Sequence, residues 1–180
     1  MEPICIVPAG DVCGEAATWD AAANRVYWTD INRFLLHSHD PDSGATRTHM
    51  FDRPVVALSL TDKKGWLLVA LGSQLILFNP EAGTRADLPA NLGGWPELRF
   101  NDGRSDPLGA FWIGSMGNNV GPNGEGLQVV DGKGTLYPLP AWHANGGDRD
   151  GNRHPQYIVL VTRQAAVLFR RHAEERDQGL

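Results

Sequence analysis

The chain has 180 residues, of which 42% are hydrophobic and 21% are charged, a composition that can bury one sizeable core. Its formal net charge is −5 and its basic residues are scattered, which excludes the basic surface typical of nucleic-acid-binding proteins. No apolar run approaches the roughly 18 residues of a membrane span. Pro3 and Pro8 interrupt the first apolar patch, so this patch does not fit the apolar core of a secretory signal. We therefore expect one cytoplasmic domain, with a small molecule as its partner and with neither nucleic acid nor membrane.

Short apolar segments separated by turn residues run along the whole chain. The sequence contains 21 Gly, 12 Pro and 6 Trp residues, and its apolar runs are mostly about four to eight residues long. This pattern favours short strands joined by turns over long amphipathic helices. The predicted fold class is all-β.

An Asp-bearing turn followed by an aromatic-rich strand occurs three times, at Asp20, Asp62 and Asp106. The period of about 40 residues is typical of propeller blades. A second repeat lies in antiphase, because residues 39–44 (HDPDSG) resemble residues 78–83 (FNPEAG), and both predict hairpin turns that close outer strands. A four-stranded blade cannot bury both faces alone, so blades stack around a channel. We expect an incomplete β-propeller of about three blades.

Glu15, near the start of the first blade, is a candidate ligand for a cation. The innermost strands of a propeller line its channel, where oxygen ligands from several blades can meet on a hard cation such as calcium. The alternative is that Glu15 is a solvated loop acid, and this residue alone does not decide between the two.

The segment Arg99-Phe100-Asn101-Asp102-Gly103 offers a second candidate site. On a strand, Arg99 and Asn101 face one side and Phe100 the other, so both polar side chains can address one ligand through the Arg fork and the Asn amide. The alternative is that residues 101–103 form a hairpin turn and that Arg99 is exposed.

Other reactive residue types give weaker signals. His37, His39 and His49 fall in or beside a polar turn region and are predicted to be surface residues. Ser115 lacks the spacing of a nucleophile elbow and has no evident helix after it, which disfavours a serine hydrolase. Cys5 and Cys13 are expected to be buried or idle thiols.

Taken together, the motifs resemble the regucalcin/gluconolactonase family in order and spacing, over roughly residues 10 to 137. They are Gly14-Glu15 with Trp19, Val26-Tyr27-Trp28-Thr29-Asp30-Ile31, Arg99-Phe100-Asn101-Asp102-Gly103, Asp106-Pro107-Leu108-Gly109 and Trp112-Ile113-Gly114-Ser115-Met116. The resemblance implies a six-bladed parent propeller with one divalent cation (calcium, zinc or manganese) in its channel, and hydrolysis of a sugar (aldono) lactone.

The resemblance also implies roles for single residues. Glu15 falls on the first metal ligand, Arg99 and Asn101 fall on substrate contacts, and Asn119 stands where some members carry an acidic substrate contact. The family's other two ligands, one of them the base, lie beyond the matching region, so no catalytic residue is identified. The implied mechanism is polarisation of the lactone carbonyl by the cation while a carboxylate takes a proton from the attacking water.

Residues 138–180 depart from the family pattern. Reading suitably chosen codons for residues 151–173 one base later gives a family-like sequence, so we expect residues 1–137 to form the partial propeller and the rest to be an out-of-frame tail. That tail is expected to be irregular or partly helical, with a helix over residues 165–176.

The loss of two of the three implied ligands has functional consequences. We expect low cation affinity and low activity in this chain, and self-association through open propeller edges. Two alternatives are a non-enzymatic calcium-binding or protein-interaction propeller fragment, and an enzyme in which two copies complete one ring.

Overall fold

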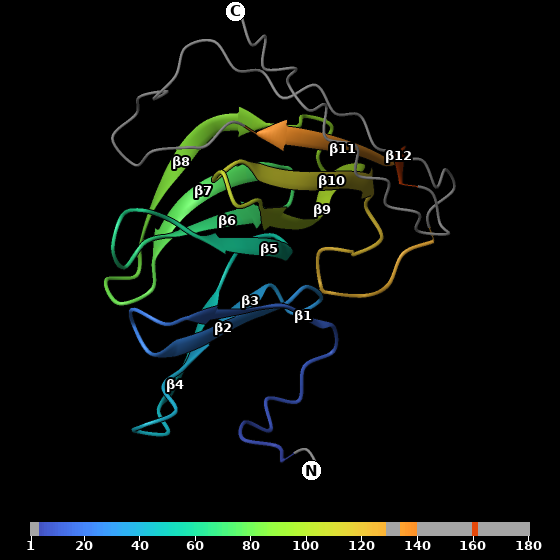
Figure 1. Ribbon diagram of the computed structural model, residues 1–180. Coiled ribbons are helices and arrows are strands. Elements are labelled where there is room, and N and C mark those ends of the chain that lie inside the picture. The colour runs from blue at the N-terminus through green and yellow to red at the C-terminus, as the bar shows by residue number, and fades with distance from the viewer. Residues whose placement is uncertain (1–3, 129–133, 140–159, 162–180) are drawn as a thin grey trace, which may run out of the picture.

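The structure is a computed structural model that describes residues 4–128, 134–139 and 160–161. The regular elements of these residues are all strands, which confirms the predicted all-β class (Figure 1). No helix in this part of the chain is long and apolar enough to cross a membrane. The strands are β1 Gly14–Asp20, β2 Arg25–Asp30, β3 Leu35–His39, β4 Thr46–Met50, β5 Val55–Leu60, β6 Leu67–Leu71, β7 Gln74–Asn79, β8 Thr84–Asn91, β9 Leu98–Ser105, β10 Phe111–Gly117, β11 Gly134–Leu139 and β12 Leu160–Val161.

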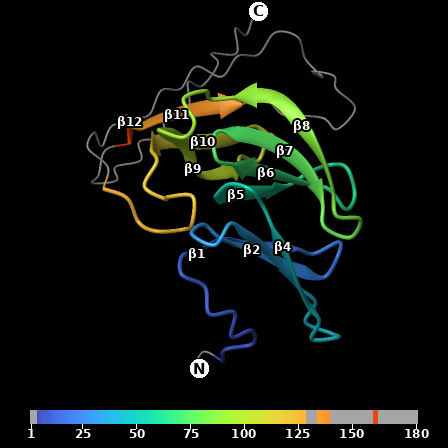
Figure 2. The ribbon, with the colours of Figure 1, turned by 180° about the vertical axis from the view of Figure 1, so that it is seen from behind.

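The strands form three antiparallel sheets of four strands each, taken in chain order: β1 to β4, β5 to β8 and β9 to β12. Figures 1 and 2 show these sheets stacked one on another, with the second between the first and the third. Strand β5 contacts both β1 and β9, so the first strands of the three sheets lie next to one another. This is the arrangement of blades around a propeller channel, and we call the sheets the first, second and third blades. The expected incomplete propeller of about three blades is confirmed.

The antiphase repeat forms two equivalent hairpin turns, one in each of the first two blades. The side-chain oxygen of Asp40 accepts hydrogen bonds from the amides two and three residues later, at 2.9 and 3.3 Å, and that of Asn79 does the same at 3.0 Å each. Gly44 and Gly83 then donate their amides to the carbonyls of Asp40 and Asn79, each at 2.8 Å and each with a positive φ. Because only Gly adopts this φ without strain, the repeat fixes the turn geometry.

The other repeat forms the turns that precede aromatic strands. Asp20 accepts the amides of Ala22 and Ala23 at 2.9 and 3.0 Å. Asp106 accepts the amide of Leu108 at 2.8 Å and, through its second oxygen, the indole N–H of Trp112 at 3.1 Å. These two Asp residues therefore hold their turns, and Asp106 also holds Trp112 of the following strand.

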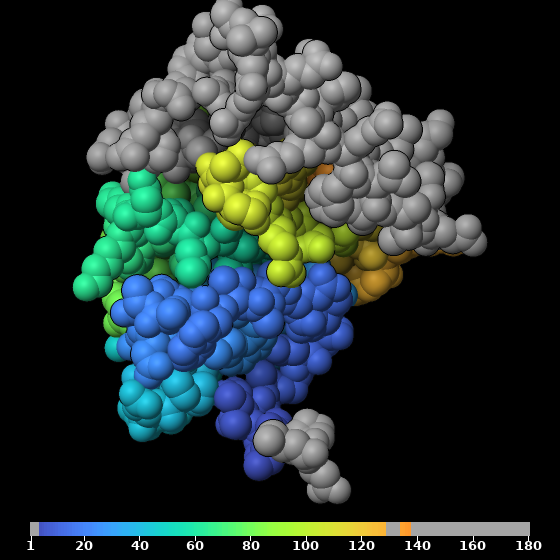
Figure 3. Space-filling view, viewed as in Figure 1, coloured from blue at the N-terminus to red at the C-terminus, as the bar shows by residue number. Residues whose placement is uncertain are grey.

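The core lies between the blades. One buried cluster joins Tyr27 and Leu36 of the first blade to the second blade, and another joins the second blade to Phe100, Phe111 and Ile113 of the third. Strand β6 is buried along its whole length because it belongs to the blade that is covered on both faces. In the space-filling view the first blade lies directly against the second and third (Figure 3).

Among the described residues, one hydrogen bond links the first blade to the third. The side-chain nitrogen of Asn32, in the turn between β2 and β3, donates to the carbonyl of Gly124 at 2.8 Å. Gly124 has a φ of 82°, and a β-carbon there would lie 2.1 Å from the Asn32 carbonyl oxygen. Glycine is thus required at this contact.

The prediction that His37, His39 and His49 are surface residues is wrong. His37 and His39 are buried because β3 is an interior strand, flanked by β2 and β4. Their Nδ1 atoms lie 2.9 Å from the hydroxyls of Thr48 and Thr46 on β4. His49 is half-buried, with its ring edge-to-face on Phe78.

The predictions for residues 138–180 lie mostly outside the described residues, including the helix over residues 165–176. Within the described part, Leu139 ends β11, and β12 pairs with β11 through Thr135–Leu160 and Gly134–Val161.

Candidate functional site

The innermost strand of each blade contains a β-bulge. In β1 the register breaks between Glu15 and Thr18, and in β9 it breaks at Asp102, directly after Asn101. Strand β5 has the same irregularity between Val55 and Ala57. A bulge re-aims the neighbouring side chains and is common beside functional sites. In β1 and β9 the bulge directly follows a residue that the sequence predicts to bind a ligand.

Both bulges hold a non-glycine residue in the left-handed region, with φ values of 55° for Ala16 and 42° for Asp102. This conformation costs about 1–2 kcal/mol for an L-residue. Such strain persists only where the surroundings fix the backbone, and it concentrates at functional sites.

A buried carboxylate holds the segment that leads to Glu15. Asp30 has no solvent exposure and accepts the amides of Val12 and Cys13 at 2.9 and 3.2 Å, together with the Nε of Arg33 at 2.6 Å. Burial alone would raise the pKa of Asp30, but these donors outweigh it and hold the pKa below its ordinary value.

A second acid fixes the same segment from outside. Asp11 accepts the indole N–H of Trp28 at 2.8 Å and pairs with Arg33 at 2.9 Å, while the Nε2 of the buried His37 lies 3.2 Å away. The backbone before Glu15 is therefore anchored to β2, β3 and the turn between them.

Glu15 itself is exposed, and its carboxylate makes no ion pair with any described residue. The thiol of Cys13 lies 3.9 Å from Glu15 Oε1, within sulfur hydrogen-bond distance. Burial raises the pKa of the Cys13 thiol, and the carboxylates of Glu15 and Asp30 raise it further, so the thiol stays a proton donor. Cys5 is exposed, and both cysteines are free.

Sequence reasoning missed the place of Cys13 beside Glu15. The two-residue spacing of Cys13 and Glu15 could have predicted this contact, because alternate residues of an extended segment share a face.

Arg99 is buried, with 3% of its surface exposed. Its Nη1 donates to the carbonyl of Phe100 at 2.8 Å and to Asn101 Oδ1 at 3.0 Å. Its Nη2 and Nε donate to Asn119 Oδ1 at 2.8 and 3.3 Å. The alternative of an exposed Arg99 and a hairpin turn at residues 101–103 is wrong, since these residues continue β9 through a bulge.

The structure thus brings Arg99, Asn101 and Asn119 into one hydrogen-bonded cluster. Asn119 follows β10, in a segment fixed by the amide of Asn118, which donates to the carbonyl of Glu97 at 2.7 Å. Burial lowers the pKa of Arg99, whereas Glu15 and Cys13 raise it. These two groups are therefore close enough to act on Arg99 electrostatically. The three predicted substrate contacts therefore form one cluster, and Glu15 lies within electrostatic range of its guanidinium.

The described residues supply only part of a cation site. They contain no group of three or more His, Cys, Asp or Glu side chains that can hold a metal ion. Glu15 fits the role of one oxygen ligand, whereas calcium takes about 6–8 oxygen ligands. The implied cation is thus left without a complete set of ligands in this part of the chain.

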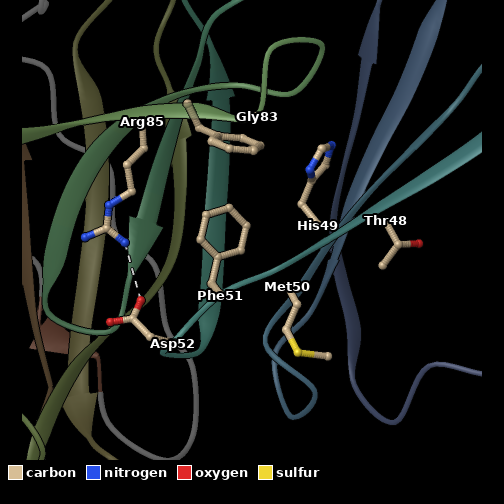
Figure 4. A pocket seen from close by; sticks show the side chains of 8 residues that line it. Thr48, His49, Met50, Phe51, Asp52, Gly83 and Arg85 are labelled. Carbon is tan, nitrogen blue, oxygen red and sulfur yellow. Dashed lines mark hydrogen bonds and ion pairs between the residues drawn. The ribbon is translucent and has the colours of Figure 1, made fainter.

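A separate cavity of about 530 Å³ lies away from these residues, beside β4 and the hairpin of β7 and β8. Figure 4 shows His49 and Phe51 of its wall, with Arg85 facing Asp52. The Arg85 Nη1 and Asp52 Oδ1 atoms are 3.4 Å apart, so this pair is neutralised. The cavity has aromatic walls and includes none of the predicted site residues.

Comparison with known proteins gives consistent matches. Residues 13–143 match the model of the SMP-30/Gluconolactonase/LRE-like region. The chain is 34% identical over 127 residues to 6-deoxy-6-sulfogluconolactonase of Pseudomonas putida, which covers 71% of this chain and 43% of that protein.

Two solved structures share the fold. A luciferin-regenerating enzyme matches with a TM-score of 0.63 and 20% identity, over 84% of this chain and 46% of that one. The calcium-binding protein regucalcin of Agrobacterium tumefaciens matches with a TM-score of 0.59 and 24% identity, over 84% of this chain and 43% of that one.

The chain spans about half the length of the curated relatives that it matches, with 43% and 58% of two of them covered. The family model, in contrast, covers most of the described residues, including Glu15, Arg99, Asn101 and Asn119. The chain therefore belongs to the SMP-30/gluconolactonase/LRE-like family.

Proposed function

We propose that this chain carries the substrate-binding part of a sugar lactone hydrolase. The observation that supports the proposal best is the hydrogen-bonded cluster of Arg99, Asn101 and Asn119. Asn101 and Glu15 each lie directly before a bulge of an innermost strand. The name of the Pseudomonas putida relative supports a sugar lactone as the substrate class.

Arg99 and Asn101 orient the substrate in this proposal. The guanidinium is held on two sides by Asn101 and Asn119, so its orientation is fixed and its remaining Nη2 N–H group can donate to an oxygen atom of a ligand. Asn101 is only half-buried, which leaves its amide able to bond with sugar hydroxyls. Fixed donors of this kind lower the barrier by positioning the substrate.

Glu15 is the proposed ligand of one divalent cation, which can be calcium, zinc or manganese. The Agrobacterium tumefaciens relative is named a calcium-binding protein, and Glu15 is an exposed carboxylate without an ion pair among the described residues. A bound cation polarises a lactone carbonyl and acidifies a bound water. The catalytic base is not assigned to any described residue.

The test is lactone hydrolysis by the purified 180-residue chain, followed by proton release with calcium, zinc or manganese added. Glu15→Gln should lower metal-dependent turnover and cation affinity at least about tenfold, because a ligand carboxylate is lost. The matched control is Glu97→Gln, the same change at an exposed acid, which should leave both unchanged.

Wild-type turnover that survives Glu15→Gln would contradict the role of Glu15. Cation binding that depends on Glu15 but gives no turnover with any lactone would contradict the hydrolase proposal for this chain, and would favour the non-enzymatic cation-binding alternative. Activity only at concentrations where the chain self-associates would favour completion of the site by two copies.

A further inference from the structure

Arg99 is a buried cation whose partners among the described residues are all neutral. Its hydrogen bonds go to one carbonyl and to two side-chain amides. No carboxylate of the described residues lies within 4.0 Å of its guanidinium. Five other described arginines do have such a partner: Arg25, Arg33, Arg47, Arg53 and Arg85.

An unpaired buried charge is costly, and proteins rarely keep one without a partner. The guanidinium cannot shed its charge, because arginine stays protonated in proteins. Burial lowers the pKa of Arg99, and Glu15 and Cys13 raise it. No described carboxylate forms an ion pair with the guanidinium, so the buried charge lacks a direct counter-charge in this part of the chain. A negative charge supplied by a ligand would remove this deficit.

The place of that ligand follows from the donors that remain. A guanidinium has five N–H groups, and four are used by the hydrogen bonds to Phe100, Asn101 and Asn119. One N–H of Nη2 is left among the described contacts, next to the amide of Asn119. The Nδ2 of Asn119 donates to no described residue, so it adds further N–H groups at the same place.

Asn119 holds the position from which a carboxylate would neutralise Arg99. Its Oδ1 accepts from both Nε and Nη2, the pair of atoms that a carboxylate engages in a bidentate ion pair. Because the amide is neutral, it aligns the guanidinium but leaves the positive charge available.

We propose that this site selects lactones that carry an additional oxyanion group, a carboxylate, sulfonate or phosphate, and that Asn119 is the residue that determines this specificity. The anion binds the free N–H groups of Arg99 and Asn119. This inference rests on the proposed function for the identity of the reacting group, whereas the anion site rests on the contacts of Arg99 and Asn119.

The first test compares glucono-γ-lactone with glucaro-γ-lactone. The two substrates differ only at one end, where the first has a hydroxymethyl group and the second a carboxylate. Wild type should have the higher kcat/KM for glucaro-γ-lactone. Asn119→Asp is an isosteric change that places a negative charge beside Arg99. It should lower the ratio of kcat/KM for glucaro-γ-lactone to kcat/KM for glucono-γ-lactone roughly 10- to 100-fold, as expected for one charge-assisted hydrogen bond.

The matched control is Asn123→Asp, which introduces the same charge on an exposed side chain of the same segment. It should leave the ratio within about twofold of wild type, because an exposed charge is screened by solvent. Asn119→Asp should also melt at a higher temperature than wild type, since it pairs a buried cation, so loss of fold would not explain its result.

A second test separates this inference from the proposed function. Inorganic sulfate is titrated at constant ionic strength while the Nε–H resonance of Arg99 is followed by NMR. A saturable chemical-shift change in wild type, with a sulfate affinity that is at least about tenfold lower in Asn119→Asp, supports anion binding even if no lactone is hydrolysed. The inference is overturned if sulfate does not bind, or if lactones are hydrolysed with a ratio that Asn119→Asp leaves unchanged.

Discussion

At the scale of single residues, Asp30 is the point where the segment before Glu15 joins the first blade. Its two oxygens accept two backbone amides from the segment before β1, two from the turn after β2, and one guanidinium N–H. Because the carboxylate is fully buried, each of these donors would lose its partner without it. The position of Glu15 depends on this carboxylate.

Asp30→Asn should therefore lower the free energy of unfolding by about 2–4 kcal/mol, as expected when a buried charged acceptor is lost. The effect should depend on pH. The pKa of Asp30 is lowered in the folded chain, so its contribution is present above the unfolded pKa of about 4 and is lost as pH falls through the lower folded pKa. Urea unfolding of both proteins at neutral and acidic pH measures this.

The control is Asp52→Asn, an exposed acid in surface ion pairs, which should cost no more than about 1 kcal/mol. An Asp30→Asn variant as stable as wild type at neutral pH would contradict the role given to Asp30.

The sequence predicts the identity of the site residues better than their environment. The strand alternation around Arg99 and Asn101 indicates a shared face, and that is confirmed. The burial of Arg99 could not be predicted from the sequence, because a buried and an exposed strand arginine can have the same local sequence. His37 and His39 look like turn residues, yet burial of an interior strand depends on neighbours far along the chain.

At the scale of elements, β1 contains a bulge that directly follows Glu15. Ala16 occupies the left-handed region there, and Ala17 is the next residue of the same strand. The register break belongs to the pairing of β1 with β2. No local sequence signal marks it, since the sequence carries Ala where a glycine would have indicated the positive φ.

Ala16→Val should destabilise the chain by about 1–2 kcal/mol or more, because a β-branched residue is strongly disfavoured at positive φ. The same change at the exposed Ala17 should be neutral or stabilising, since valine is favoured in strands. Thermal unfolding of the two variants measures the difference. Equal melting temperatures would mean that β1 pairs with β2 without this bulge.

The hairpin turns were predictable because their chemistry is local. An Asp or Asn followed by Pro and, three residues later, by Gly specifies the same hydrogen bonds at Asp40 and Asn79. The bulges were not predictable because their register is set by a second strand.

At the scale of the whole molecule, the blades are held together by the buried clusters between them and by ion pairs between the first and second blades. Glu81 of the second blade pairs with Arg25 and Arg47 of the first. Leu36 is fully buried in the cluster between these two blades. Stability is thus coupled from one blade to the next.

Leu36→Ala should cost about 2–5 kcal/mol, as for other large-to-small changes in a core. Leu108→Ala, at a residue that is 73% exposed, should change stability by less than about 0.5 kcal/mol. Denaturant unfolding followed by both tryptophan fluorescence and circular dichroism measures the two variants. A small effect of Leu36→Ala would mean that the first blade contributes little to the fold.

The number and order of the blades could be predicted because both repeats recur with one period. How the blades meet could not, since contacts such as Asn32 with Gly124 join residues that are 92 positions apart. No local pattern encodes a pairing at that separation.

That contact also has a consequence for the order of events during synthesis. Residue 32 leaves the ribosome long before residue 124, and chains grow at about 5–20 residues per second. The first blade therefore waits on the order of ten seconds before Gly124 can accept the Asn32 hydrogen bond. During that interval the nascent chain must rely on contacts within and between its first two blades.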